Sequence, residues 1–234
     1  MIISHRNRFI FIKTRKTAGT SIEIALSQFC GPEDVITRIS KDDELIRMSL
    51  GYLGPQNYKD PTQYLNLKYW RRFLKRKNGK NSTGQHGSSS FIKKYIGENI
   101  WNGYYKFCFE RNPFDKAISH YYWAARKLSS PPEINDFLQT YPRYLLSNWS
   151  IYTIEDKIAV DHIGKYESMD EDLKLIFRKL GLPYCILPNT KGYARKNRQH
   201  YSQVLNEKSR HLIEEICAKE IENFGYDWVK LEET

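Results

Sequence analysis

The sequence predicts an α/β fold in which a central, mostly parallel β-sheet is flanked by helices. Short apolar runs typical of buried strands alternate with segments whose apolar residues recur at helical spacing. A helix follows a strand directly at residues 9–29 and again at residues 104–125, and this alternation favours parallel strands. Ligands bind such sheets at the carboxyl ends of the strands, so residues that follow a strand are candidates for a site.

The first half of the chain predicts one strand and two helices. Residues 9–13 are a short apolar run, and the helix after it has a stripe formed by Ala18, Ile22, Ala25, Leu26 and Phe29. Residues 33–84, interrupted by Gly and Pro, predict an irregular excursion. A short helix is expected over residues 89–96, where Gly97 ends it.

The second half predicts two more strands, each followed by a helix. Residues 104–109 form the clearer strand, and Asn112-Pro113 is typical of a helix start. A further strand is expected within residues 158–166, followed by a capping box that begins at Ser168. The last helix is expected over residues 206–224.

Length and composition favour a single domain spanning residues 1–234. No run approaches the roughly 20 apolar residues that span a bilayer, and no signal peptide is evident, so we expect a cytoplasmic protein without a transmembrane segment. Four cysteines without paired spacing predict buried free thiols rather than a zinc site. A Golgi-lumenal origin stays open if an anchor is missing from this sequence. Asn81-Ser82-Thr83 and Asn148-Trp149-Ser150 are formal glycosylation sequons, which would matter only in a secreted protein.

The net charge of +10 is concentrated in two segments. Residues 68–80 contain seven Lys and Arg, residues 191–198 contain four, and neither segment contains an acid. The rest of the chain is therefore nearly neutral, which favours local anion-binding loops over a uniformly basic surface. A solvated surface loop is the simpler interpretation of residues 68–80.

The first candidate motif is the stretch KTRKTAGTS at residues 13–21, between a strand and a helix. A helix N-terminus offers unpaired N–H groups to a phosphate, while Lys16 adds a charge and Thr20 and Ser21 add hydroxyls. Thr20 with Glu23 also matches a capping box, so a purely structural role is an open alternative. The common nucleotide loop GxxxxGK[ST] is absent.

The second candidate motif is RNPFDKAIS at residues 111–119. Arg111 at the strand end suits a phosphate through its planar guanidinium, and Ser119 follows two helical turns later. Taken alone, this motif is better explained as an ordinary helix start with Ser119 facing solvent.

Together the two motifs resemble the 5′-phosphosulfate and 3′-phosphate loops of sulfotransferases that use 3′-phosphoadenosine 5′-phosphosulfate (PAPS). The resemblance is greatest to Golgi-type carbohydrate sulfotransferases and their bacterial relatives, and it extends to residues 161–167 and 224–226. It implies a three-layer, P-loop-like fold, PAPS as co-substrate without a metal, and a hydroxyl-bearing acceptor that is a saccharide. Residues 68–80 suit an anionic saccharide acceptor as well as they suit a solvated surface loop.

Carried over residue by residue, the resemblance implies three groups of nucleotide contacts. Arg111 and Ser119 would bind the 3′-phosphate. Arg195 and Lys196 would belong to a loop near the end of the chain that closes over the nucleotide. Lys16 would also neutralise the bridging oxygen as the S–O bond breaks. The 5′-phosphosulfate would be bound by residues of the first motif, namely Lys16, Thr17, Ala18, Gly19, Thr20 and Ser21.

Two positions depart from the family's pattern. Arg15 stands where relatives usually have proline, and Glu110 stands where they usually have an apolar residue. Arg15 adds to the positive field, whereas Glu110 is positioned to pair with Arg111 and weaken its phosphate contact.

The resemblance favours His86 as the base that removes the acceptor proton, because it lies just before the helix that precedes the second motif. A histidine in a flexible loop is the alternative. His120, on the helix of the second motif, is expected to be a structural or surface residue. Glu110 and Glu167 are the next candidates for the base.

Two other functions compete with sulfuryl transfer. A phosphoryl-transfer kinase of related fold is disfavoured by the missing Walker loop. A nucleic-acid-binding protein would explain the positive net charge, but the presence of two phosphate-binding motifs would then be a coincidence. No nucleic-acid partner is therefore expected. Relative affinity for PAPS, ATP and an oligonucleotide separates the three.

Overall fold

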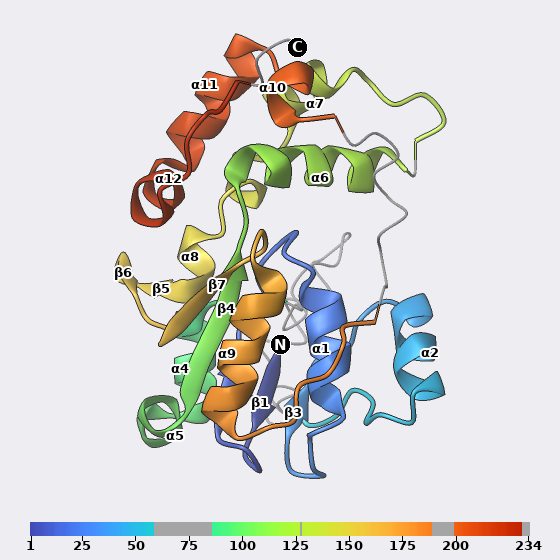
Figure 1. Ribbon diagram of the computed structural model, residues 1–234, viewed down its shortest axis with the longest axis vertical. Coiled ribbons are helices and arrows are strands. Elements are labelled where there is room, and N and C mark those ends of the chain that lie inside the picture. The colour runs from blue at the N-terminus through green and yellow to red at the C-terminus, as the bar shows by residue number, and fades with distance from the viewer. Residues whose placement is uncertain (59–85, 127, 189–198, 231–234) are drawn as a thin grey trace, which may run out of the picture.

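A five-stranded sheet forms the centre of the fold in the computed structural model, which describes residues 1–58, 86–126, 128–188 and 199–230 (Figure 1). β2, β4 and β7 pair in parallel, whereas β1 is antiparallel to both β2 and β3. Four strands therefore run in one direction, and the prediction of a mostly parallel sheet is confirmed. The order across the sheet is β3 (Val35–Ile36), β1 (Ile2–Ser4), β2 (Phe9–Phe11), β4 (Tyr105–Glu110) and β7 (His162–Lys165).

Helices cover both faces of this sheet because side chains along each strand alternate between the faces. Phe9, Phe11 and Phe107 pack on one face against α1 (Gly19–Ser27) and α9 (Met169–Leu180). Ile10 and Cys108 point to the other face, where the cover comes from α4 (Ser89–Ile96), α5 (Glu98–Gly103) and α8 (Trp149–Tyr152). The result is a helix–sheet–helix arrangement.

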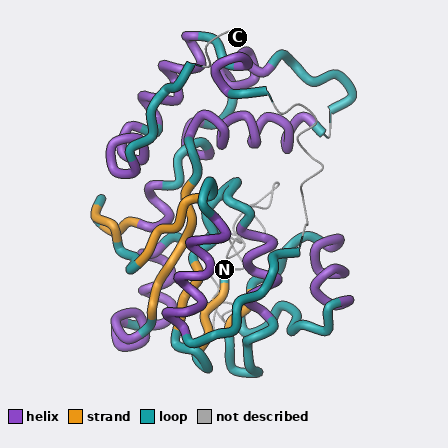
Figure 2. The backbone as a smooth tube through the Cα atoms, viewed as in Figure 1, coloured by secondary structure: helices purple, strands orange, loops and turns teal. Residues whose placement is uncertain are grey.

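A second group of helices lies beyond the carboxyl ends of the parallel strands (Figure 2). α6 (Pro113–Ala125) follows β4 and crosses above the sheet (Figure 1). Its apolar residues Phe114 and Ile118 share a separate core with the surrounding helices. These helices are α7 (Ile134–Thr140), α10 (Tyr201–Val204), α11 (Glu207–Ile216) and α12 (Ala218–Phe224).

Most helix ends that were predicted from local sequence signals are found where they were expected. Asn112 caps α6 by accepting from the N–H groups of Phe114 and Asp115, and Gly97 and Gly181 end α4 and α9. The predicted last helix is wrong in one respect, because the chain breaks at Cys217 into α11 and α12. The predicted capping box is also wrong, since the Ser168 hydroxyl donates to Asp172 and caps no backbone N–H.

The prediction of an irregular excursion over residues 33–84 is wrong in part, because this stretch contains β3 and α2 (Lys41–Ser49). α2 escaped prediction because it exposes Leu45 and Met48 and instead buries Arg47. Residues 59–84 lie outside the described residues.

The buried Arg47 belongs to an ion cluster centred on Glu23 of α1. Lys13 Nζ lies 2.8 Å from one Glu23 oxygen, Arg47 lies 3.6 Å from the other, and all three side chains are almost fully buried. The Thr37 hydroxyl donates to Glu23 at 2.8 Å. Burial alone would raise the pKa of Glu23, but Lys13 and the other neighbouring positive groups lower it to about 2.

Two hairpin strands and the cysteines complete the description. β5 (Thr153–Ile154) and β6 (Lys157–Ile158) form a separate antiparallel pair. Cys30, Cys108 and Cys217 are buried free thiols, as predicted, whereas Cys185 is only half-buried. No helix among the described residues is both long and apolar enough to cross a membrane.

The Glu23 cluster predicts a large loss of stability in Glu23→Gln. The substitution leaves Lys13 buried without a counter-charge and removes one of the two acids that pair with Arg47, the other being Glu44. Breaking such a cluster costs about 3–5 kcal/mol in free energy of unfolding. Because the folded-state pKa lies below the ordinary value of 4.5, the stabilisation is fully present above pH 4.5 and disappears as pH falls toward 2.

Urea denaturation at pH 7 and at pH 3 measures this effect. Glu98→Gln is the matched control, because Glu98 is exposed and pairs with Lys93 on the surface. Equal unfolding free energies for wild type and Glu23→Gln at pH 7 would show that the buried cluster contributes nothing to folding.

Candidate active site

The loop between β2 and α1 has the backbone form of an anion-binding turn. Lys16 and Ala18 both adopt positive φ, at 62° and 55°, and α1 begins at Gly19 directly after them. Non-glycine residues held there are strained, and such turns direct successive N–H groups into one concave surface. The first turn of α1 carries no acidic residue, so its positive end is not neutralised locally.

The capping-box alternative for Thr20 and Glu23 is wrong. α1 begins before Thr20, at Gly19, and its N-cap residue makes no side-chain capping hydrogen bond. Glu23 instead pairs with Lys13 in the buried cluster, which anchors the first residue of the motif beneath the loop. Thr20 and Ser21 are both buried in the first turn of α1.

Gly19 is required by a close approach within this loop. A Cβ atom at residue 19 would lie 2.7 Å from Lys13 Cγ, a distance that real Cβ contacts do not reach. Lys13 cannot move aside freely because its ammonium group is held by Glu23. The glycine therefore lets the loop fold tightly over the buried ion pair.

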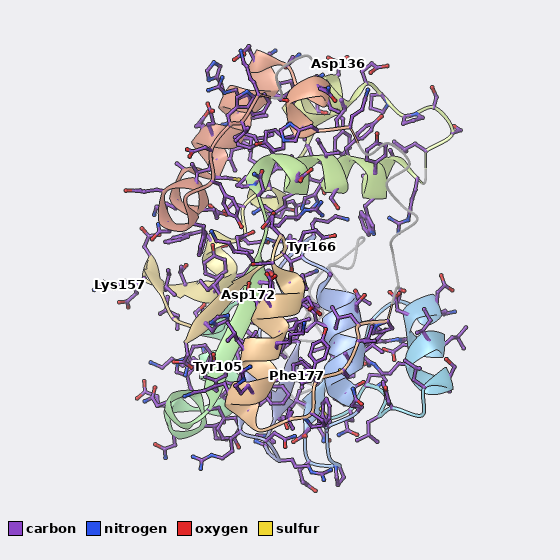
Figure 3. All side chains as sticks on the ribbon, in the orientation of Figure 1. Tyr105, Asp136, Lys157, Tyr166, Asp172 and Phe177 are labelled. Carbon is purple, nitrogen blue, oxygen red and sulfur yellow. The ribbon has the colours of Figure 1, made fainter. Side chains whose placement is uncertain are left out.

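Arg111 reaches the first loop from the end of β4. Its Nη1 donates to the carbonyl oxygen of Lys16 at 3.4 Å, and its guanidinium lies 4.1 Å from the centre of the Tyr166 ring. Figure 3 labels Tyr166, which follows β7, in the region between α6 and the sheet. Arg111 Nε is buried and has no hydrogen-bond partner among the described residues.

The expected pairing of Glu110 with the Arg111 guanidinium does not occur. Glu110 Oε1 accepts the backbone N–H of Arg111 at 2.9 Å and pairs with Lys116 Nζ at 2.9 Å. Glu110 and Lys116 are both fully buried. All of these contacts are made by Oε1, whereas Oε2 is buried without a hydrogen-bond partner among the described residues. The Arg111 guanidinium is directed toward the first loop.

The helix of the second motif presents Trp123 to the first loop. Lys16 Nζ lies 5.6 Å from the centre of the Trp123 ring, within the range of a cation–π contact. Ser119 is half-buried and precedes Trp123 by four residues, so both occupy the same face of α6. Lys16 therefore contacts both Arg111 and Trp123, and Ser119 lies one helical turn before Trp123 on α6.

His86 lies against the same loop. Its Nδ1 is 2.7 Å from the carbonyl oxygen of Lys13, which can only accept, so Nδ1 carries the proton and donates. This leaves Nε2 as the unprotonated nitrogen of a neutral imidazole. Burial, together with the positive charges of Lys13 and Arg15, lowers the pKa of His86 to about 3.

His120 is structural rather than a surface residue. It is 4% exposed, and its Nδ1 lies 3.2 Å from the Tyr141 hydroxyl. Burial and the charges of Lys16 and Lys116 lower the pKa of His120 to about 2. Of the other candidate bases, Glu167 accepts the N–H of Asn112 at 2.8 Å, and the carboxylate of Glu110 is enclosed.

Comparison with known proteins identifies the family. A model of the sulfotransferase family matches residues 1–227, almost the whole chain. The chain belongs to the sulfotransferase family. It is also 33% identical, over 103 residues that make up 39% of this chain and 80% of the relative, to a protein of Archaeoglobus fulgidus described only as uncharacterized. No solved structure matches.

The structure of this sulfotransferase brings together the predicted site residues that it describes. The first motif, Arg111, Ser119 and His86 all lie at the carboxyl ends of β2 and β4 or on the helix above them. Arg195 and Lys196 lie outside the described residues, as do all of residues 68–80. The roles expected of those segments stay predictions.

Three residues of this region were not expected to contribute to the site from the sequence. Tyr166 supports the Arg111 guanidinium, Trp123 lies beside Lys16, and Asn148 contacts both Arg15 and Glu110. The spacing of four between Ser119 and Trp123 is a signal that would have identified Trp123. Within the described part of the chain, no three His, Cys, Asp or Glu side chains gather to form a metal site.

Proposed function

We propose that this sulfotransferase transfers the sulfuryl group of PAPS to a hydroxyl of a saccharide. The observation that supports the proposal most directly is the contact between the two motifs, in which Arg111 Nη1 lies 3.4 Å from the Lys16 carbonyl oxygen. Loops that touch in this way suit one ligand with two anionic groups, such as the 5′-phosphosulfate and 3′-phosphate of PAPS. Sulfotransferases of this kind generally use that donor.

The proposed contacts divide between the two loops. The N-terminus of α1, with Lys16, Thr20 and Ser21, binds the 5′-phosphosulfate through N–H groups, hydroxyls and a mobile ammonium. Arg111 and Ser119 bind the 3′-phosphate. The buried Nε of Arg111, which lacks a partner among the described residues, suits this role because buried donors are normally satisfied.

The chemical step needs a base and a positive charge. His86 Nε2 accepts the proton of the acceptor hydroxyl while the acceptor oxygen bonds to sulfur and the S–O bond to the phosphate breaks. Lys16 stabilises the negative charge that forms on the departing phosphate oxygen. The products are the sulfated acceptor, adenosine 3′,5′-bisphosphate and a proton on His86.

Trp123 supports a saccharide acceptor. Its side chain is 40% exposed next to Lys16, although large aromatic rings are usually buried. The Arg126 guanidinium lies 4.3 Å from the centre of the same ring, so a sugar would pack its C–H face on the part of the ring that Arg126 and Lys16 leave exposed. That position places such a sugar near the proposed sulfuryl site.

The proposed 3′-phosphate contact predicts that nucleotide binding depends on Arg111. Adenosine 3′,5′-bisphosphate should bind wild type about 10–100-fold more tightly than adenosine 5′-monophosphate, as expected for charge-assisted hydrogen bonds. Arg111→Ala should abolish most of that difference, whereas Arg178→Ala, on the exposed side of α9, should not. Calorimetry measures all three proteins; equal affinity of wild type for both nucleotides would reject the assignment.

His86→Ala should lower kcat by about 10²–10⁴-fold, the usual effect of removing a positioned base. The affinity for adenosine 3′,5′-bisphosphate should change little, because His86 is not among its proposed contacts. His211→Ala is the matched control, since His211 is exposed on α11. Near-normal turnover of His86→Ala would move the search for the base to Glu167.

The lowered pKa of His86 also predicts the pH dependence of the reaction. The base form is the neutral imidazole, which persists at all pH values above about 3, whereas an ordinary histidine is half protonated at pH 6.5. The kcat/KM for PAPS should therefore stay level from pH 7.5 down to about pH 5. A fall with a midpoint near pH 6.5 that disappears in His86→Ala would contradict the neutral state of this imidazole.

Trp123→Ala should raise the KM for a saccharide acceptor about tenfold, the usual order for losing one well-placed aromatic contact. Trp123→Phe should retain most of the affinity because it keeps a flat ring. Initial rates at saturating PAPS measure the acceptor KM. An unchanged KM in Trp123→Ala would remove Trp123 from the acceptor site.

A further inference from the structure

Asn148 connects the two loops that bind the nucleotide in the proposed function. Its Oδ1 accepts the backbone N–H of Arg15 at 2.9 Å, and its Nδ2 donates to the Arg15 carbonyl oxygen at 3.1 Å and to Glu110 Oε1 at 3.1 Å. Both amide protons and one lone pair are therefore used. The Asn148 side chain holds the first loop through its backbone and the end of β4 through a carboxylate.

Glu110 carries this connection on to the second loop. The oxygen that accepts from Asn148 also accepts the backbone N–H of Arg111 at 2.9 Å. A continuous path of hydrogen bonds thus runs from the Arg15 backbone through Asn148 and Glu110 to the Arg111 backbone. Asn148 and Glu110 are both fully buried, so water does not compete for these bonds.

Glu220 of α12 frees the Asn148 side chain for this role. An asparagine directly before a helix normally caps it, but Asn148 precedes α8 and makes no side-chain capping bond. Glu220 Oε1 instead accepts the backbone N–H groups of Asn148 and Trp149, at 2.8 and 3.3 Å. The Asn148 side chain, which is the acceptor of the formal sequon, is fully buried, whereas Ser150 of the same sequon is exposed.

The two departures from the family's pattern are the two partners of Asn148. A proline at residue 15 has no N–H to donate to Oδ1, and an apolar residue at 110 has no oxygen to accept from Nδ2. The first hydrogen bond therefore requires a residue other than proline at position 15, and the second requires an acceptor such as the Glu110 carboxylate at position 110.

We propose that Asn148 is a positioning residue that fixes the distance between the two phosphate-binding loops. The inference rests on the proposed function, because it assigns one loop to each phosphate of a single nucleotide. Two subsites held at a fixed separation bind a ligand carrying both groups more tightly, since the ordering cost is met before binding. Ligands with only one phosphate gain nothing from that separation.

Calorimetry with three nucleotides tests this role. In Asn148→Ala the affinity for adenosine 3′,5′-bisphosphate should fall at least about tenfold, as for loss of buried hydrogen bonds. The affinities for adenosine 5′-monophosphate and adenosine 3′-monophosphate should stay within about threefold of wild type, which is the scatter of independent sites. Equal weakening of all three, or of none, would overturn the positioning role.

Two substitutions at residue 15 test the same bond without changing the buried amide. Arg15→Pro removes the N–H that Asn148 accepts, whereas Arg15→Ala removes the guanidinium and keeps the N–H. Arg15→Pro should show the selective loss of bisphosphate affinity, Arg15→Ala should keep the preference for two phosphates, and Arg15→Pro with Asn148→Ala should lose no more than either alone. Identical preferences in the Pro and Ala variants would overturn the inference.

The outcomes separate this inference from the proposed function. If wild type prefers the bisphosphate and Asn148→Ala retains that preference, the proposed function stands and the positioning role fails. If wild type binds all three nucleotides alike, the assignment of the two loops to one nucleotide fails first.

Discussion

Because β2 pairs with β4 in parallel, the loops after these two strands leave the sheet side by side at one edge. Neighbouring strands lie about 4.8 Å apart, so residues that are about a hundred positions apart in sequence come into contact without a long connection. The contact of Arg111 with the Lys16 carbonyl follows from this pairing, as does the bridge through Asn148. α6, which begins where β4 ends, then places Ser119 and Trp123 above the same edge.

Buried acidic side chains form ion pairs with lysines beneath this edge of the sheet. Glu23 holds Lys13 beneath the first loop, and Glu110 holds Lys116 beneath the second. Glu220 lies 3.7 Å from Lys116 and joins the second cluster. These acids pair with the buried lysines, whereas the Arg111 guanidinium lies against the Lys16 carbonyl oxygen and the Tyr166 ring. Neutral imidazoles are expected in such a field, because positive neighbours and burial both disfavour protonation of His86.

The parts of the structure that could be predicted from the sequence are those with local causes. The capping of α6 by Asn112 and the ends of α4 and α9 at glycines depend on residues within one helical turn. The candidate site could be located for the same reason, since each motif lies between a strand and its helix. Family resemblance supplied the assignment of roles, which local pattern alone left open.

The features that escaped prediction depend on partners distant in sequence. α2 has no apolar stripe and is held by the buried Arg47, whose partner Glu23 lies in another helix. Glu110 next to Arg111 predicted a pairing that Lys116 and Asn148 prevent by occupying its carboxylate. Asn148 belongs to neither phosphate-binding motif, and only the fold brings it between the loops.

The measurement that tests the central claim most directly is a crystal structure with adenosine 3′,5′-bisphosphate. The account predicts the 5′-phosphate at the N-terminus of α1 beside Lys16, and the 3′-phosphate between Arg111 and Ser119. A nucleotide that binds with either phosphate elsewhere would contradict it. The pocket lined by Phe114, Arg210 and Trp228, on the opposite side of α6 from Trp123's contact with Lys16, is the alternative location to inspect.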